Sequence, residues 1–258
     1  MNQNTYPYEL GLALSGGGAR GFAHLGALKA LDEFQLKPNI IAGTSAGAIA
    51  GVLYADGYTP EEIMELFIGL DLSQFAEIQI PKAGIFNMVK FKKFLTKHLR
   101  AKTFEELSIP LHVVTTDLDD GISAVFKQGQ LIDPIIASCS IPIIFNPVLI
   151  DGIHYVDGGL FHNFPVSTIR DMCQKVIGVN VDPMVQKKYS QTIIHIAERS
   201  FHYMFGANSI PDKALCDILI ETEGVGSFKI FDLAHIHNIF NMGYKAAIQT
   251  LSEKKAIE

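Results

Sequence analysis

Residues 40–51, IIAGTSAGAIAG, join a short apolar run to a glycine-flanked serine and a second apolar run. The first run is typical of a buried strand and the second of a buried helix. Gly43, Ser45 and Gly47 fit the G-x-S-x-G pattern of a nucleophile elbow, in which a sharp strand-to-helix turn holds the serine in a strained conformation. The stretch therefore predicts a strand–elbow–helix unit with Ser45 as nucleophile, although small residues would also pack a purely structural junction.

Strand-like and helix-like segments alternate along the rest of the chain. Apolar runs typical of strands lie at 10–14, 39–42, 109–117, 175–181 and 217–221. Helical periodicity is found at 22–34, 46–56, 60–69, 87–99, 191–205 and 236–252. The Asp151-Gly152 pair, flanked by apolar residues, predicts a hairpin. This alternation predicts an α/β fold, a three-layer α/β/α sandwich with a mainly parallel central sheet.

Length and composition favour one domain. A chain of 258 residues that is 48% hydrophobic can bury a substantial core, so we expect a single domain over residues 1–258. The three cysteines lack metal-ligand spacing and are too few for a disulfide framework, and the first residues lack the features of a secretory signal. These features favour a cytoplasmic location. The net charge of −6 argues against nucleic acid as a partner.

A second glycine-rich stretch, SGGGARG, follows the first predicted strand. Its Gly16, Gly18 and Gly21 fit the G-x-G-x-x-G spacing of a dinucleotide site. We disfavour a nucleotide-binding oxidoreductase because the second strand ends in IIAGTSAG, without the acidic residue that would bind the ribose. A P-loop is excluded because Phe22 and Ala23 occupy the positions of its lysine and its hydroxyl residue.

The glycine loop has a different role if Ser45 is a nucleophile. Both segments follow strands of one predicted sheet, so the two loops are expected to face each other at its carboxyl edge. Backbone N–H groups of Gly17, Gly18 and Ala19, at a helix N-terminus, would then donate to the oxyanion that forms when Ser45 attacks a carbonyl group. Arg20 would either add positive potential there or form an exterior salt bridge.

The base that would activate Ser45 is less well defined by spacing. A Ser-Asp-His triad would use a late histidine, for which His235 and His237 are best placed, although both also fit ordinary surface histidines. We expect His24 to pack in the first helix. Several aspartates follow strand candidates, and spacing does not select among Asp117, Asp119, Asp120, Asp157 and Asp182.

Three stretches occur in a characteristic order: GLALSGGGARGFAHLGAL, IIAGTSAGAIAG and VDGGLFHNFPV. Together they resemble the signature blocks of the patatin-like phospholipases, and they lie within about residues 10–170. Smaller agreements, among them ASCSIP and CDILIE, extend the resemblance to about residue 250. Three ordered blocks are far more specific than any one motif, and the chain looks most like the compact bacterial members of the family.

The resemblance implies a catalytic dyad in place of a triad. By matching motif, Ser45 would be the nucleophile and Asp157 the base, with no histidine, metal or cofactor required. The elbow glycines would be Gly43 and Gly47. The oxyanion site would comprise Gly16, Gly17, Gly18 and Arg20. Asn163 and Pro165 continue the third block, and we expect them to have a structural role.

The activity implied by the resemblance is that of a serine acyl-ester hydrolase acting on lipids, of the phospholipase A or lysophospholipase type. The alternatives are a catalytically silent lipid-binding protein and an acyltransferase that uses the same nucleophile. An exposed aspartate is a weak base, so dyad chemistry depends on the oxyanion loop. Partial desolvation of Asp157 would make its carboxylate more basic.

Two further segments bear on the substrate, which we expect to be a lipid or another acyl ester. The apolar segment 135–150 leads towards Asp157 and would either line an acyl-chain groove or belong to the core. Between Lys82 and Lys102 there are seven basic residues and no acidic one, with apolar residues at helical spacing. This basic amphipathic helix, near 88–100, would pack on the domain, make peripheral contact with the inner face of a membrane, or both.

Overall fold

The computed structural model describes residues 6–70, 77–78, 84–182 and 192–255. Its central sheet has the strand order β11-β10-β1-β2-β5-β9-β8, and β6 also pairs with β5. These strands are β1 (Tyr8–Leu14), β2 (Ile40–Thr44), β5 (Leu111–Asp117), β6 (Ile122–Phe126), β8 (Val148–Ile150), β9 (Ile153–Asp157), β10 (Cys173–Asn180) and β11 (Ile218–Glu221). The pairs from β11 to β5 are parallel, whereas β6, β8 and β9 pair antiparallel. The sheet is therefore mainly parallel, as predicted.

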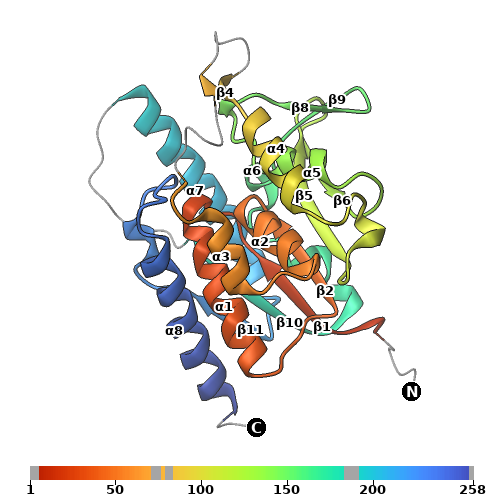
Figure 1. Cartoon of the computed structure of the whole chain (residues 1–258), viewed down its shortest axis with the longest axis vertical. Coiled ribbons are helices and arrows are strands. Elements are labelled where there is room, and N and C mark those ends of the chain that lie inside the picture. Colours follow the sequence, from red (N-terminus) through yellow and green to blue (C-terminus); the bar gives the residue numbers. More distant parts are fainter. Residues whose placement is uncertain (1–5, 71–76, 79–83, 183–191, 256–258) are drawn as a thin grey trace.

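Helices cover both faces of this sheet. They are α1 (Phe22–Glu33), α2 (Ala46–Ala55), α3 (Pro60–Phe67), α4 (Val89–His98), α5 (Ile132–Ser138), α6 (Gly159–His162), α7 (Ile193–Lys213) and α8 (Ile236–Lys255). In Figure 1, α1, α2, α3 and α8 lie in front of the sheet. On the opposite face, the segment after α6 packs on the strands, and α7 packs on α6. The predicted three-layer α/β/α arrangement is confirmed.

The alternation of side chains along the strands fills two separate layers of core. Leu12 and Leu14 of β1 belong to the large apolar cluster formed with α1, α2 and α8. Ala13, between them, belongs to a second cluster on the other face, together with Phe164 and Val166. Successive side chains of a strand point to opposite faces, so a strand buried on both faces needs an uninterrupted apolar sequence. This requirement explains why the central strands could be predicted from apolar runs in the sequence.

The predicted elements agree with the structure except at the end of α7 and at several short elements that were not predicted. All five strand candidates are present, and the hairpin forms between β8 and β9 with positive φ at Asp151 (51°) and Gly152 (88°). The predicted helix at 191–205 is wrong at its end, because α7 continues through Pro211 to Lys213; residue 191 lies outside the described residues. The helix α5 and the strand β6 were not predicted. Neither was a small sheet of β3 (Glu77–Ile78), β4 (Gly84–Asn87) and β7 (Ile143–Phe145).

Candidate active site

Ser45 lies at the turn between β2 and α2, with φ 52° and ψ −119°. This left-handed conformation is strained for a residue with a side chain, and it is the conformation that the elbow pattern predicts. A Cβ atom on Gly43 would lie 2.6 Å from the carbonyl carbon of Gly47, and one on Gly47 would lie 2.2 Å from the carbonyl oxygen of Leu14. The two glycines therefore let α2 start directly against β1 and β2.

The Ser45 main chain is held by a residue that the sequence did not single out. Its N–H donates to Oγ of Ser138, the last residue of α5, at 2.8 Å. The Ser138 hydroxyl in turn donates to the carbonyl oxygen of Val114 in β5 at 2.6 Å. Ser138 is completely buried. It thus ties the elbow to the neighbouring strand through a two-bond chain.

Asp157 ends β9 on the other side of β5 from the elbow strand. Its N–H donates to the Ser140 carbonyl oxygen at 3.0 Å, and its Oδ1 accepts the Gly159 N–H at 2.8 Å. Oδ2 has no partner with hydrogen-bond geometry in the described part of the chain. Burial raises the pKa of this carboxyl to about 7, against smaller lowering effects of the Gly159 N–H and the Ser45 hydroxyl. Asp157 is therefore a carboxyl of raised basicity that lies close enough to Ser45 for the serine hydroxyl to affect its pKa.

The turn after α5 contacts both members of this pair, because Ser138 binds the Ser45 N–H and Ser140 binds the Asp157 N–H. Cys139, between them, is buried beside both side chains. Burial and the charge of Asp157 raise the pKa of the Cys139 thiol well above its ordinary value, and the Ser45 hydroxyl lowers it to a smaller extent. Cys139 is therefore an uncharged thiol at neutral pH.

The glycine loop leaves β1 and forms a short 3₁₀ turn, Gly18–Gly21, before α1. Three of its N–H groups are already used. That of Gly16 donates to the Asn163 carbonyl oxygen (2.9 Å), that of Ala19 to the Ile230 carbonyl oxygen (2.6 Å), and that of Arg20 to the Gly17 carbonyl oxygen (3.3 Å). Those of Gly17 and Gly18 donate to no acceptor among the described residues. The donors that remain for an oxyanion are therefore the N–H groups of Gly17 and Gly18.

Arg20 forms a buried ion pair. This differs from the exterior salt bridge considered above, and the positive charge is paired and does not act on the glycine loop alone. Its Nη1 donates to Oδ1 of Asp182, and its Nε donates to the Phe228 carbonyl oxygen at 3.2 Å. The Nδ1 atom of His202 lies 3.0 Å from the same Asp182 oxygen. Arg20 thus connects the glycine loop to the end of β10 and to the segment before α8.

An apolar cavity of about 150 Å³ opens beside Ser45. It lies between the glycine loop, α1, α2, α3 and α4, and its lining includes Phe22, Leu25, Ile49, Ile63, Phe67, Met88, Phe91, Cys139, Ile141, Phe145 and Phe231. Cys139, Ile141 and Phe145 come from the apolar segment 135–150, whereas Ile135 and Ala137 of the same segment are in the core. The segment therefore contributes both to the wall of the cavity and to the core. The cavity can accept a hydrocarbon chain whose end group lies at Ser45.

Among the described residues, no hydrogen bond or ion pair joins the remaining candidate residues to Ser45 or Asp157. His235 is exposed and its Nδ1 lies 2.7 Å from Asp232, and His237 is exposed too. His24 is fully buried, with its Nε2 2.8 Å from the Ser15 carbonyl oxygen, and burial lowers its pKa to about 4, so it is neutral. Asp117 binds the turn after β5, Asp119 pairs with His154, and Asp120 is exposed in that turn.

Comparison with known proteins identifies the family of this chain. The family model described as "Patatin-like phospholipase" matches residues 12–169. A mimivirus protein from Acanthamoeba polyphaga mimivirus is 33% identical over 189 residues, which are 65% of this chain and 64% of the viral one. Human patatin-like phospholipase domain-containing protein 6 is 32% identical over 183 residues, covering 67% of this chain and 13% of the human protein. This chain therefore spans only part of these relatives.

The fold is also found among solved structures. The crystal structure of VipD from Legionella pneumophila superposes with a TM-score of 0.61 at 15% sequence identity, over 96% of this chain and 67% of VipD. A serine at a strained strand-to-helix turn and a glycine loop, both at the carboxyl edge of a mainly parallel sheet, define the class, an α/β protein with an elbow of this geometry. Within that class, the chain belongs to the patatin-like phospholipase family.

Proposed function

We propose that this protein is a serine acyl-ester hydrolase that acts on lipids, of the phospholipase A or lysophospholipase type, through a Ser45–Asp157 dyad. The observation that carries the proposal is the buried Asp157 carboxyl, with its pKa raised to about 7, beside an elbow serine at an apolar cavity. A base whose pKa lies near neutrality accepts a serine proton far better than an exposed aspartate does. A metal ion or cofactor is not part of the proposed reaction.

The proposed reaction has two halves. In the first, Asp157 takes the hydroxyl proton while Ser45 Oγ bonds to the ester carbonyl carbon and the carbonyl electron pair moves to oxygen. The N–H groups of Gly17 and Gly18 stabilise this oxyanion. The bond to the leaving alcohol then breaks, and the alcohol takes the proton from Asp157. In the second half, water gives a proton to Asp157 and attacks the acyl group, and Ser45 recovers its proton as the fatty acid leaves.

The lipid preference of this proposal rests on the apolar cavity, where the acyl chain would lie between α1 and α4. Within the described residues, no helix has both the length and the apolar character needed to cross a bilayer. We infer that the protein reaches lipid peripherally, at the inner face of a membrane, through α4. Phe91 of α4 is buried and lines the cavity, whereas Lys93 and Lys97 are exposed.

The test is hydrolysis of a short-chain chromogenic ester and of a lysophospholipid by the wild type, Ser45→Ala, Asp157→Asn and the double variant His235→Ala/His237→Ala. We expect the first two variants to lose activity by a factor of about 10³ or more and the histidine variant to keep it. Loss in the histidine variant, with the fold intact by circular dichroism, would contradict the dyad. A wild type without hydrolytic activity on either ester would contradict the hydrolase, and transfer of the acyl group to added alcohol would then identify an acyltransferase.

A further inference from the structure

The side chain of Asn163 is buried, and it makes no hydrogen bond with the described residues. It is 1% exposed, and neither Oδ1 nor Nδ2 has a partner in the part of the chain that the structure describes. Its main chain, in contrast, is fully bonded, because its N–H donates to Oδ1 of Asn208 (2.9 Å) and its carbonyl oxygen accepts the Gly16 N–H (2.9 Å). A buried carboxamide without partners costs stability, so its presence needs a reason other than folding.

The unbonded amide lies beside the nucleophile. A Cβ atom placed on Gly16 would lie 2.2 Å from Asn163 Oδ1 and 3.4 Å from the Cβ of Ser45. The amide and the elbow serine therefore flank the same point of the glycine loop. Gly16 is required there because any side chain would occupy the space that the Asn163 amide fills.

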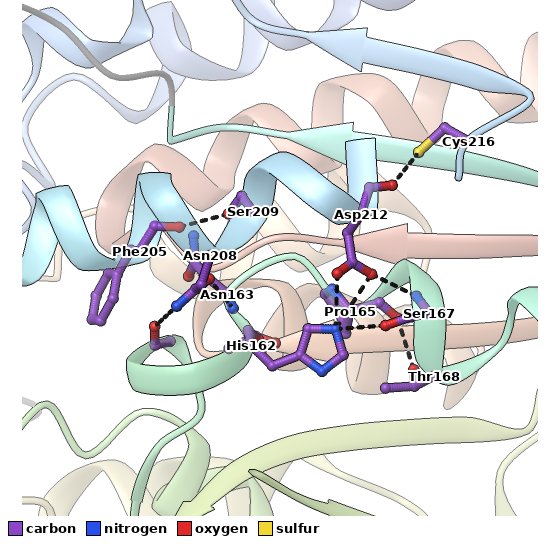
Figure 2. Close-up of polar contacts among 12 residues, drawn as sticks. His162, Asn163, Pro165, Ser167, Thr168, Phe205, Asn208, Ser209, Asp212 and Cys216 are labelled. Atoms are coloured by element: carbon purple, nitrogen blue, oxygen red, sulfur yellow. Dashed lines mark hydrogen bonds and ion pairs between the residues drawn. The ribbon is translucent and has the colours of Figure 1, made fainter. Parts of the chain in front are cut away.

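The loop that carries Asn163 is fixed by other residues (Figure 2). Nδ2 of Asn208 in α7 donates to the carbonyl oxygens of Gly159 (2.7 Å) and Leu160 (3.2 Å). Further along, Asp212 of α7 accepts the N–H of Ser167 at 2.6 Å. The polar contacts that hold the loop thus come from α7, from main-chain groups and from Thr44 of β2, whose hydroxyl donates to the His162 carbonyl oxygen at 2.9 Å. Among the described residues, the side-chain amide of Asn163 takes no part in holding the loop.

Resting on the proposed function, we propose that Asn163 is a further catalytic residue, whose Nδ2–H donates to the oxyanion alongside the N–H groups of Gly17 and Gly18. Since neither amide atom has a partner among the described residues, a half-turn of the carboxamide exchanges oxygen and nitrogen without breaking a hydrogen bond to them. The donor is already desolvated before the reaction starts, which strengthens its bond to a developing negative charge. Being neutral, it leaves the basicity of Asp157 unchanged, whereas a nearby cation would lower it.

The test compares Asn163→Ala and the isosteric Asn163→Asp with the wild type in kcat, KM and melting temperature. We expect kcat to fall by a factor of about 10²–10³ in both, with KM changed by less than about threefold, because the donor acts on the transition state. The matched control is Thr222→Val, which removes a different buried polar group, a hydroxyl without a partner in the described residues, directly after β11 and three strands from β2. This control is expected to keep the wild-type kcat.

A second readout separates this proposal from the hydrolase itself. A fluorophosphonate probe forms an O–P bond to Ser45 Oγ as fluoride leaves, and its P=O oxygen needs the same donors. We expect the labelling rate to fall in both Asn163 variants in proportion to kcat. Wild-type hydrolysis with kcat within twofold in Asn163→Ala would overturn the role of Asn163 and leave the hydrolase standing. A wild type that neither hydrolyses esters nor reacts with the probe would overturn both.

Discussion

Ser138 holds the main chain of the nucleophile, although it does not touch the reacting atoms. Its hydroxyl accepts the Ser45 N–H and donates to Val114, so its removal leaves two buried main-chain groups unbonded. In Ser138→Ala we expect a loss of about 1–3 kcal/mol in the free energy of unfolding. We also expect kcat to fall at least about tenfold with KM little changed, because the strained elbow is no longer fixed. Urea unfolding and steady-state kinetics measure both effects.

The comparison for Ser138 is Ser123→Ala on the exposed strand β6, which should change neither quantity. Full kcat in a Ser138→Ala protein that has lost stability would show that the elbow keeps its geometry without this bond.

Because of Asp157, we expect stability to fall and activity to rise as the pH increases. Burial raises its pKa from an ordinary value of 3.8 to about 7 in the folded chain. The folded state therefore holds the proton more tightly than the unfolded state, so this group's stabilising contribution is fully present below pH ~4 and is lost as pH rises through about 7. The loss at pH 8 is at most about 4 kcal/mol. Activity has the opposite sign, because the base must be unprotonated.

We expect kcat/KM to rise with pH with a midpoint near 7. The side chain of Asp157→Asn does not titrate. We therefore expect the free energy of unfolding of this variant, minus that of the wild type, to increase between pH 5 and pH 8. Denaturant unfolding of both proteins at the two pH values measures this gain. A difference that stays constant with pH would mean that Asp157 titrates as an ordinary aspartate.

At the residue scale, the G-x-S-x-G pattern predicted the elbow at Ser45, and the family resemblance singled out Asp157 as the candidate base. The roles proposed for Ser138 and Asn163 could not be predicted from the sequence, because both residues lie beside Ser45 only through the folding of distant segments. Ser138 meets Ser45 across 93 positions, and a single serine in an apolar helix carries no signal of that contact. Asn163 was noticed as part of a block, but its lack of hydrogen bonds is visible only in three dimensions.

At the scale of elements, α4 divides its surface between the cavity and solvent. Phe91 and Leu95 are buried, while Lys93 and Lys97 are exposed on the outer face. In Lys93→Glu/Lys97→Glu we expect binding to vesicles of anionic phospholipid to weaken about tenfold or more, since each basic residue near the surface contributes about 1 kcal/mol. Hydrolysis of a small water-soluble ester should not change. Vesicle sedimentation and the ester assay measure the two properties.

A matched pair of charge reversals is available on α8, where Lys245 and Lys254 are exposed. Equal weakening by Lys245→Glu/Lys254→Glu would mean that net charge, and not α4, governs the binding.

The elements that sequence pattern predicted are those buried on one or two faces, because burial imposes a period. The three residues of β7 are too few to show alternation, and Ile143 among them has a positive φ of 72° and is exposed. α5 contains Pro134 in its first turn and has only seven residues. The predicted helix ends at residue 205, whereas α7 continues to Lys213 through Pro211, a residue type that normally ends a helix.

At the scale of the whole molecule, the Arg20–Asp182 pair joins the beginning of the chain to its last third. Both side chains are less than a tenth exposed, and Arg20 also binds the Phe228 carbonyl. Removing one partner of a buried pair leaves an uncompensated charge, so we expect Arg20→Ala to lose about 3–5 kcal/mol of unfolding free energy. Replacing both, as Arg20→Met/Asp182→Leu, should cost less than the single change. Thermal and urea unfolding measure the difference.

The contrast for this pair is Lys29→Ala, which breaks the exposed ion pair with Glu61 and should cost less than about 1 kcal/mol. A similarly small loss in Arg20→Ala would show that Asp182 finds another partner, for which His202 is placed.

The cavity also belongs to this scale, since its walls come from α1, α3, α4, the turn after α5 and the segment before α8. No stretch of sequence contains it, so its position beside Ser45 could not be predicted, whereas the apolar character of one wall could.

The most direct measurement for the whole account is intact-protein and peptide mass spectrometry after rapid quenching of a reaction with a p-nitrophenyl acyl ester. We predict one acyl group on the peptide that contains Ser45, formed within the pre-steady-state burst and absent in Ser45→Ala. An acyl group on Cys139, which lies beside Ser45, or turnover that survives Ser45→Ala, would contradict the assignment of Ser45 as the nucleophile.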